Sequence, residues 1–433
     1  MRIASLRVEN FKSVGPAVEL SALGALEIFH GPNAAGKSNL LLALRAAWSL
    51  LRRAPDLLVL RQVIEQAKLA DYLEVRGAVF NRRLPSETPC RLRLELVEPA
   101  LVASFRLQRD ETGAVRVTVE ELTIEGEAQR PPFTRADPHD DWLEELYVPE
   151  DDNPDADAAA FREQELTHWQ NRLRERLQSL MAVESNPTLL LLDDRRTPPG
   201  KRSWEHLLAT LRDSPAAAAR LRYRAVVQAM KAFPEAGDGD LTAWREGDAV
   251  GVGIEETTTG EVISLDEMGA GVEQVFRLLV AVFGLPSSVV AIEEPELNLS
   301  LAVQERMLAS LRQAVERGRK QLLLTSHSFA FDGAPTFWEV RRDEQGFTQV
   351  ERRARQTQGN TLEAYERLVT TQFGCEPEPP AWVTRDGLLK LPDWVRKGLD
   401  LKYGEMLFFR FNEHHVLEAL TAEQLQAEEE PKA

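Results

Sequence analysis

The segment GPNAAGKS at residues 31–38 is the feature that most constrains the fold of this chain, because it satisfies the spacing G-x-x-x-x-G-K-[ST]. An apolar strand pattern, ALEIFH at 25–30, precedes it, and a helix-prone apolar stretch runs from 39 to 53. In this order of strand, loop and helix, backbone amides and a helix N-terminus converge on one point. The sequence therefore predicts a phosphate-binding loop in an α/β fold. The alternative is an ordinary glycine turn.

The residue types within the segment suit a nucleoside triphosphate. Gly31 and Gly36 allow the backbone to wrap a phosphate, and Lys37 supplies a cation for the β- and γ-phosphates. The hydroxyl of Ser38 suits Mg²⁺, which prefers oxygen ligands. We therefore expect ATP and Mg²⁺ as ligands, and the expected nucleotide-binding residues are Gly31, Pro32, Asn33, Ala34, Ala35, Gly36, Lys37, Ser38 and Asn39.

Two adjacent carboxylates end a second apolar strand pattern, SVVAIEEPE at 288–296. Open α/β sheets bind ligands at the carboxyl ends of their strands, so these acids are expected at the site. Glu293 could hold Mg²⁺ through water, and Glu294 could orient or deprotonate an attacking water. Taken alone, the string is typical of a solvated turn.

Two weaker patterns flank these acids. The apolar run QLLLTSHS at 321–328 ends near His327, which we expect to sense the γ-phosphate. Alone, such a histidine is usually structural. In SLDEMGAGVEQV at 264–275, Gly269 and Gly271 precede a helix and offer a second set of amides for phosphate.

Composition narrows the class of protein. The net charge of −17 disfavours general attraction to nucleic acid or to an anionic membrane. Only two cysteines occur, far apart, which is consistent with a reducing cytoplasm. The first residues alternate apolar and polar, and no apolar run reaches membrane-spanning length, so we expect neither a signal peptide nor a membrane segment.

The order of patterns predicts a mostly parallel core sheet with an antiparallel β-subdomain, a helical insertion and a small C-terminal α+β extension. We expect residues 1–126 to form the first half of the core with the antiparallel strands. Residues 127–247 are expected to form an acidic loop and a helical insertion, 248–335 the second half of the core, and 336–433 the extension.

Five motifs occur in a familiar order: NFKS at 10–13, GPNAAGKSN at 31–39, LDEMGAG at 265–271, IEEPELNLS at 292–300 and TSHS at 325–328. Together they resemble the ABC-type ATPase heads of the RecF/SMC-like group, in particular OLD-like AAA-family ATPases and the ATPase subunits of bacterial anti-phage systems. The resemblance covers about residues 1–53 and 248–335. It implies two heads dimerising head to tail, with Glu294 as the catalytic carboxylate, His327 as the switch histidine, and Gly269–Gly271 reaching the γ-phosphate in trans.

This sequence departs from the family pattern in three places. Glu293 stands where a metal-binding aspartate is usual, Gly269 takes the place of the signature serine, and 297–300 read LNLS where LHP is common. These changes favour slow turnover. The stretch between the core halves lacks the sustained heptads of a coiled-coil arm, and no DxD follows residue 335, so we expect no TOPRIM nuclease in this chain.

The leading hypothesis is an ATP-driven switch that controls a partner effector, a nuclease or toxin, in anti-phage defence or DNA maintenance. We expect it to form a homodimer or a higher homo-oligomer through its ATP sites. Alternatives are a scaffold that binds ATP to dimerise but scarcely hydrolyses it, and a transporter-type ATPase subunit. If DNA is contacted, the basic candidates are Arg172 and Arg176, and the cluster Arg195, Arg196, Lys201 and Arg202. For both groups a solvated surface is the simpler interpretation.

Overall fold

The computed structural model describes residues 1–59, 62–131, 154–183, 186–187, 189–192, 203–247, 249–318, 320–328, 331 and 336–354, and four short strands beyond them. The chain divides into two compact units, Met1–Arg355 and Gln356–Ala433. In the second unit, β19 (Trp382–Val383) pairs antiparallel with β20 (Leu389–Lys390), and β21 (Leu407–Phe411) pairs antiparallel with β22 (Leu417–Thr421).

A six-stranded sheet is the core of the first unit, and its strand order is β11-β15-β16-β3-β17-β18. The first five strands pair in parallel, and β18 returns antiparallel to β17. This confirms the predicted mostly parallel core sheet. The strands are β11 (Leu189–Leu192), β15 (Val289–Glu293), β16 (Gln321–Ser326), β3 (Leu26–His30), β17 (Thr336–Arg342) and β18 (Thr348–Ala354).

Alternate residues of the core strands pack into two different hydrophobic clusters. Phe29, Ala291 and Leu323 belong to the cluster that contains the first long helix, whereas Ile28 and Leu324 belong to the second cluster. Because successive side chains of a strand point to opposite faces, this division shows that the sheet is buried on both sides. Burial on both sides explains why these strands read as continuous apolar runs.

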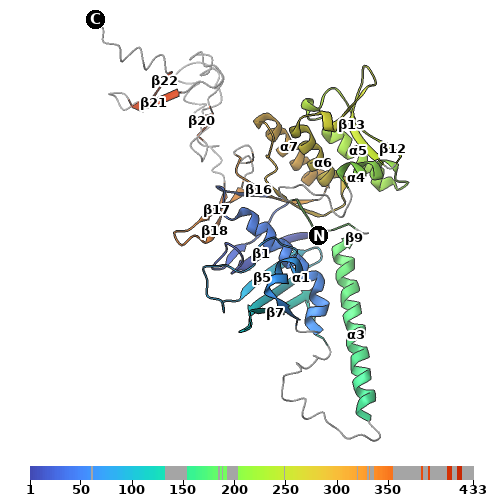
Figure 1. Ribbon diagram of the computed structural model, residues 1–433, viewed down its shortest axis with the longest axis vertical. Helices are drawn as coiled ribbons and strands as arrows, with labels where there is room; N and C mark the ends of the chain where they lie inside the picture. The colour runs from blue at the N-terminus through green and yellow to red at the C-terminus, as the bar shows by residue number, and fades with distance from the viewer. Residues whose placement is uncertain are drawn as a thin grey trace. The chain divides into compact units, whose positions relative to one another are not determined.

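The first cluster lies between the core sheet and a second, antiparallel sheet of order β2-β1-β5-β6-β7-β4, with β8 on β7 (Figure 1). Helix α1 (Lys37–Val59) lies between them and contacts β5, β6, β7 and β16. The short helix α2 (Gln66–Tyr72) follows β4. The strands are β1 (Arg2–Glu9), β2 (Val18–Leu20), β4 (Gln62–Glu65), β5 (Cys90–Val97), β6 (Leu101–Arg109), β7 (Ala114–Ile124) and β8 (Glu127–Ala128).

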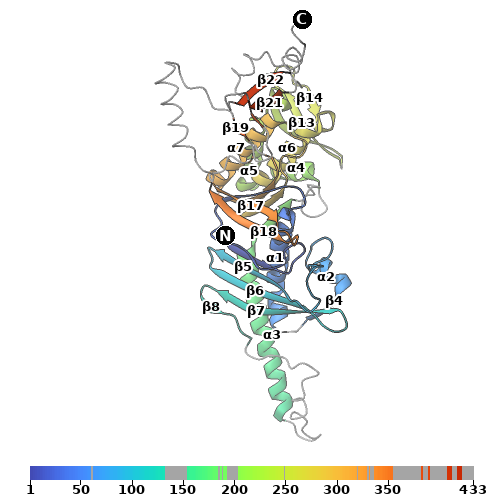
Figure 2. The same ribbon diagram turned by 90° about the vertical axis from the view of Figure 1, so that its left-hand side faces the viewer.

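Both views show a helical layer on the other face of the core sheet (Figures 1 and 2), and the second cluster joins this layer to the sheet. Its helices are α4 (Trp204–Asp213), α5 (Ala217–Met230), α6 (Ala270–Leu279), which continues into the π-turn Val280–Gly284, and α7 (Leu301–Gly318). A three-stranded antiparallel sheet accompanies them: β12 (Gly239–Glu246), β13 (Ala249–Glu256) and β14 (Val262–Ser264). Short 3₁₀ turns occupy Pro234–Ala236 and Leu265–Glu267.

The segment expected as an insertion contributes to both layers. Helix α3 (Pro154–Met181) packs on α1, burying Leu173 and Leu177, and is followed by the short strands β9 (Ala182–Val183) and β10 (Asn186–Pro187). Strand β11, from the same segment, extends the core sheet beside β15. In the part of the chain that the structure describes, no helix is both long and apolar enough to cross a bilayer.

The structure describes only one of the two groups of basic residues that could contact nucleic acid. Arg176 on α3 lies 2.8 Å from Glu125 and 3.6 Å from Glu127, so acidic neighbours compensate its charge. Arg172 lies one turn earlier on the same helix. The cluster Arg195, Arg196, Lys201 and Arg202 lies outside the described residues.

Gln321 joins the two sheets through a buried amide. Its carbonyl oxygen accepts from the Ile3 amide at 2.7 Å, and its NH₂ group donates to the carbonyl oxygens of Ile3 (2.8 Å) and Gly24 (2.9 Å). Buried backbone groups require such partners. This one side chain thus fixes β1 of the antiparallel sheet against the start of β16.

Replacing Gln321 by alanine leaves the Ile3 amide and carbonyl without these partners. We expect the free energy of unfolding to fall by about 1–3 kcal/mol, measured by urea denaturation. The control is Gln129→Ala, because Gln129 donates from an exposed position to the carbonyl of Glu127. Equal unfolding midpoints for the two variants would refute this role of Gln321.

Candidate functional site

The glycine loop connects β3 to α1, as the sequence predicts. Gly31 follows β3 directly, and Lys37 and Ser38 are the first two residues of α1. Ala34 and Gly36 have left-handed backbones, with φ of +62° and +108°. Nζ of Lys37 donates back to the carbonyl oxygens of Gly31 at 2.7 Å and Pro32 at 3.0 Å. The loop therefore curls around its own lysine ammonium.

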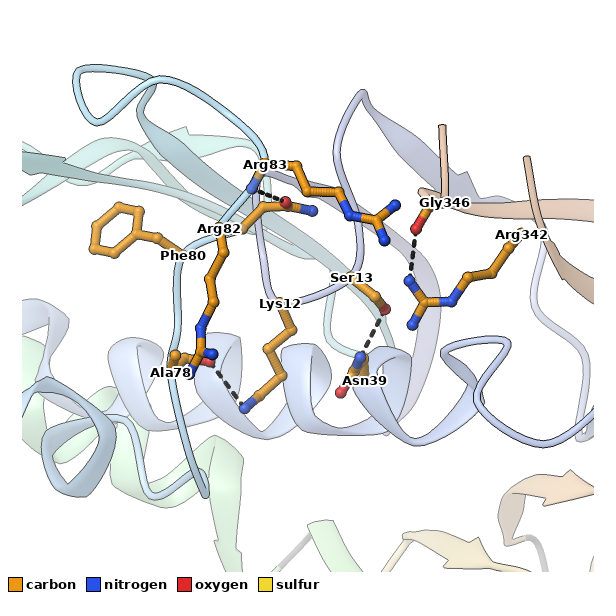
Figure 3. Close-up of a pocket in the computed structure, with 10 residues that line it drawn as sticks. Lys12, Ser13, Asn39, Ala78, Phe80, Arg82, Arg83, Arg342 and Gly346 are labelled. Carbon is orange, nitrogen blue, oxygen red and sulfur yellow. Dashed lines mark hydrogen bonds between the residues drawn. The ribbon is translucent and has the colours of Figure 1, made fainter. Parts of the chain in front are cut away.

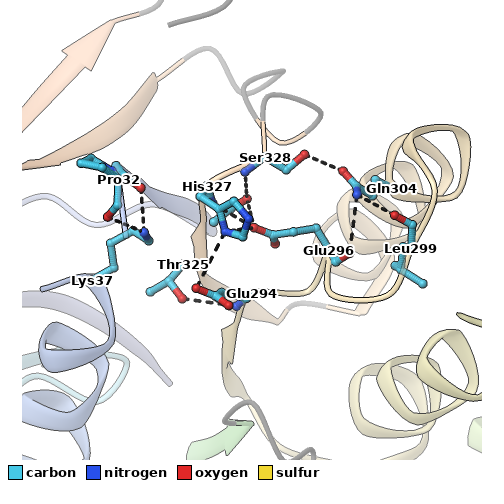
Figure 4. Close-up of polar contacts among 11 residues, drawn as sticks. Pro32, Lys37, Glu294, Glu296, Leu299, Gln304, Thr325, His327 and Ser328 are labelled. Carbon is cyan, nitrogen blue, oxygen red and sulfur yellow. Dashed lines mark hydrogen bonds and ion pairs between the residues drawn. The ribbon is translucent and has the colours of Figure 1, made fainter. Parts of the chain in front are cut away.

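The lysine ammonium is buried beside carboxylates. Burial lowers the pKa of Lys37, because water no longer solvates the charged form, and the negative charges of Glu294 and Glu296 oppose that shift. These two acids follow β15, which lies two strands from β3, and Figure 4 shows them at the same edge of the sheet as Lys37. Residues far away in the sequence thus oppose the effect of burial on the pKa of Lys37.

The adjacent glutamates take different positions because the backbone turns sharply between them. Glu293, the last residue of β15, is buried, and its Oε2 lies 3.1 Å from the guanidinium of Arg76. Glu294 has a left-handed φ of +43°, and its amide donates to the carbonyl of Thr325 at 2.9 Å. Its side chain is 28% exposed, so water reaches this carboxylate.

His327 follows β16 and lies between two carboxylates (Figure 4). Its Nδ1 is 3.3 Å from Oε1 of Glu296 and 3.8 Å from Oε1 of Glu294. The buried Oε1 of Glu296 also accepts from the hydroxyl of Ser326 at 2.7 Å and from the amide of His327 at 2.8 Å. Glu296 therefore holds both the backbone and the ring of the histidine.

The glycine pair lies at a different place. Gly269 caps the N-terminus of α6, and Gly271 lies in its first turn. A Cβ atom on Gly271 would come 3.1 Å from the carbonyl of Asn298, and both glycines line an apolar cavity of about 370 Å³ with the Asn298–Ser300 segment. The structure thus packs this motif against the loop that follows Glu294.

A second cavity of about 270 Å³ opens beside the N-terminus of α1 (Figure 3). Asn39 lines it and donates through Nδ2 to Oγ of Ser13 at 2.6 Å. Four cationic side chains surround it: Lys12, Arg82, Arg83 and Arg342. Burial and the charge of Arg76 lower the pKa of Lys12. The cavity is therefore suited to a polar, anionic ligand.

The structure brings Lys37, Glu294 and His327 to one edge of the core sheet (Figure 4). Sequence reasoning missed Glu296 and Arg76. Glu296 had a signal, because it is the third acid of the EEPE string, but Arg76 lies in an unremarkable stretch, VRGAV. The basic cavity was missed as well, since its cations come from three separate segments.

The fold and the geometry of this edge define a P-loop ATPase head of the ABC type. Residues 28–331, more than half of the chain, match the family described as "AAA domain, putative AbiEii toxin, Type IV TA system". The chain belongs to this family. No curated protein matches it in sequence.

The solved structures that this chain resembles include SMC heads. A crystal structure of an SMC head bound to the C-winged-helix domain of ScpA aligns with a TM-score of 0.50 at 12% identity, covering 84% of this chain and all of that one. An SMC head domain from Thermotoga maritima aligns with a TM-score of 0.45 at 12% identity, covering 81% of this chain and 98% of that one. At such low identity the first similarity supports the fold alone.

Gly36 offers a test of the loop geometry with a matched control. A side chain there would meet the hydroxyls of Thr348 and Ser13, whereas at Gly113, also left-handed at +83°, a Cβ meets nothing within 4 Å. We expect Gly36→Ala to weaken binding of a fluorescent ATP analogue at least ten-fold and Gly113→Ala to leave it unchanged. Equal affinities in both variants would contradict the described loop.

Proposed function

We propose that this protein binds and hydrolyses ATP as a homodimeric switch that controls a partner effector in anti-phage defence or DNA maintenance. The observation that carries the proposal is the convergence of Lys37, Glu294 and His327 at the carboxyl edge of the core sheet. These are the groups that phosphoryl transfer to water needs: a cation for the phosphates, a carboxylate for the water and a donor for the developing charge.

The phosphates of ATP bind at the glycine loop, where they compete with the carbonyls of Gly31 and Pro32 for the ammonium of Lys37. Amides at the start of α1 add further donors. The basic cavity beside Asn39 lies at the same end of α1 and supplies further cations that attract the phosphates. Binding of the phosphates is thus mainly electrostatic.

The hydroxyl of Ser38 and, through water, the carboxylate of Glu293 would hold Mg²⁺, which would neutralise charge on the phosphates. The donor set fits, because both side chains offer oxygen ligands and Glu293 already faces a cation, the guanidinium of Arg76, at 3.1 Å. Arg76 is half exposed, with a side chain 49% accessible, so it can move aside. Glu293 thereby replaces the shorter aspartate usual in related heads.

Each of the three remaining side chains, Glu294, His327 and Glu296, has one role in hydrolysis. Glu294, which water reaches, orients the attacking water and accepts its proton. His327 donates to the γ-phosphate, and Glu296, bonded to both Ser326 and His327, keeps the imidazole in place. Glu294 and His327 are the catalytic residues, and Glu296 is a positioning residue.

A second copy of the chain completes the site in this proposal. Gly269 and Gly271 offer the amides at the start of α6, yet they pack against Asn298–Ser300 of their own chain. In the proposed dimer, these amides face the γ-phosphate that is bound by the glycine loop of the second copy. The toxin–antitoxin description of the family and the ScpA-bound SMC head support an additional protein partner, such as a nuclease or toxin. We place the protein in the cytoplasm.

A scaffold that dimerises on ATP with little hydrolysis is the alternative. It is less favoured, because the carboxylate of Glu294 follows a buried strand and lies 3.8 Å from Nδ1 of His327.

Glu294→Gln separates binding from hydrolysis. We expect it to bind ATP, to lose at least 100-fold in turnover because the proton acceptor is gone, and to accumulate a dimer on light scattering with ATP. Lys37→Ala, the control, should neither bind nor dimerise. Unchanged turnover in Glu294→Gln would refute the catalytic assignment, and an unchanged mass would refute the dimer.

Glu296→Gln tests whether this acid acts through the histidine. The amide retains an acceptor for Ser326 but loses the charge facing Nδ1, so we expect kcat to fall about ten-fold with KM nearly constant. In a His327→Ala background the same change should cost less than two-fold, because the partner is already gone. Equal losses in both backgrounds would show that Glu296 acts only on the fold.

A further inference from the structure

We propose that the β17–β18 hairpin is a positioning element that holds the glycine loop in its phosphate-binding shape, with Thr348 as the principal residue. The inference rests on the proposed ATP binding and adds residues that lie outside every motif of the sequence. Its basis is a set of hydrogen bonds between the hairpin, the glycine loop and the segment that contains Ser13.

Thr348, the first residue of β18, is fully buried. Its hydroxyl donates to the carbonyl of Ala35 at 3.0 Å, and its amide donates to the carbonyl of Ser13 at 2.9 Å. Oγ of Ser13 lies 2.7 Å from Oγ1 of Thr348. Because the single hydroxyl proton of Thr348 goes to Ala35, Ser13 must be the donor in that second contact.

These bonds form one directed chain. Nδ2 of Asn39, in the first turn of α1, donates to Oγ of Ser13 at 2.6 Å, Ser13 donates to Thr348, and Thr348 donates to Ala35. The chain thus starts at Asn39, just after the glycine loop, and returns to the loop at Ala35, four residues earlier. All three side chains are needed to complete it.

Arg342 on β17 adds a second anchor. Its Nε donates to the carbonyl of Ala34 at 2.7 Å, while its Nη1 donates to the carbonyl of Gly346 in the hairpin turn at 2.5 Å. The hairpin therefore binds two consecutive carbonyls of the glycine loop, those of Ala34 and Ala35. Ala34 has the left-handed backbone that an alanine rarely adopts, so this contact stabilises a strained residue.

The orientation of these carbonyls decides where the amides point. In a trans peptide the carbonyl of one residue and the N–H of the next point in opposite directions. Holding the Ala35 carbonyl toward the hairpin therefore turns the N–H of Gly36 away from the hairpin. A loop that cradles an anion requires that arrangement before the ligand arrives.

The glycine loop and the hairpin are closely packed. A Cβ on Gly36 would collide with the hydroxyls of both Thr348 and Ser13, and one on Gly31 would collide with the carbonyl of Val340 on β17. The hairpin thus touches the glycine loop along its length. Loss of a single bond should then alter the shape of the loop rather than be absorbed.

Thr348→Val keeps the shape of the side chain and removes the hydroxyl, whereas Thr348→Ser retains it. We expect Thr348→Val to raise the KM for ATP about ten-fold with kcat changed less than two-fold, and Thr348→Ser to stay within two-fold of the wild type. Thr210→Val is the control, because the Thr210 hydroxyl donates to the His206 carbonyl on α4, away from the loop. A general loss of stability would not produce this split between KM and kcat.

Arg342→Met provides a second test in case the Thr348 variants fail to fold. It should fold, because Arg342 is exposed and methionine preserves the aliphatic part of its side chain. It should raise the KM for ATP about three-fold or more while the melting temperature stays unchanged. KM values within two-fold of the wild type for every folded variant would overturn the inference. A wild-type protein that does not bind ATP at all would instead overturn the proposed function.

Discussion

The parallel pairing of β3, β16 and β15 is the constraint on which the site depends. Ser326 lies opposite His30, and Glu293 lies opposite Thr325, so the three strands end at the same edge. The glycine loop, His327 and Glu294 are the residues that follow. A shift of one residue in the pairing of β3 with β16, or of β16 with β15, would move the functional residue that follows the shifted strand by about 3.3 Å. It would also exchange the two buried faces of that strand. The hydrophobic clusters on both faces prevent such a slip.

The sequence alone predicts those elements whose pattern lies within one continuous stretch of residues. The strand, loop and helix around Lys37, and the apolar strands before Glu293 and His327, could be predicted because their residues are continuous in the chain. Arg76 could not be predicted at the site, since it meets Glu293 across 217 positions. Likewise, β11 reads as an isolated apolar run, and only its pairing with β15 makes it part of the core sheet. Contacts of this kind depend on tertiary packing, which produces no periodic pattern of residues in the sequence.

The charge of the site differs from that of the whole chain. The protein carries a net charge of −17, and Glu293 and Glu296 are buried beside the proposed phosphate site. Arg76 faces one of these acids, and donors from Ser326 and His327 satisfy the other. The basic cavity then supplies a local positive field at the end of α1. Such local fields, rather than net charge, determine which ligands approach a cleft.

Both halves of the head contribute to the proposed nucleotide site, and the order of the chain makes this necessary. The glycine loop and Ser13 come from the N-terminal half, whereas Glu294, His327 and the β17–β18 hairpin come from the C-terminal half. The bond between Ser13 and Thr348 joins residues 335 positions apart. Because the glycine loop takes its shape from the hairpin and its counter-charges from the acidic motif, neither half alone presents a complete phosphate site. In the proposed dimer the same principle extends to a third component, the α6 glycines of the second chain.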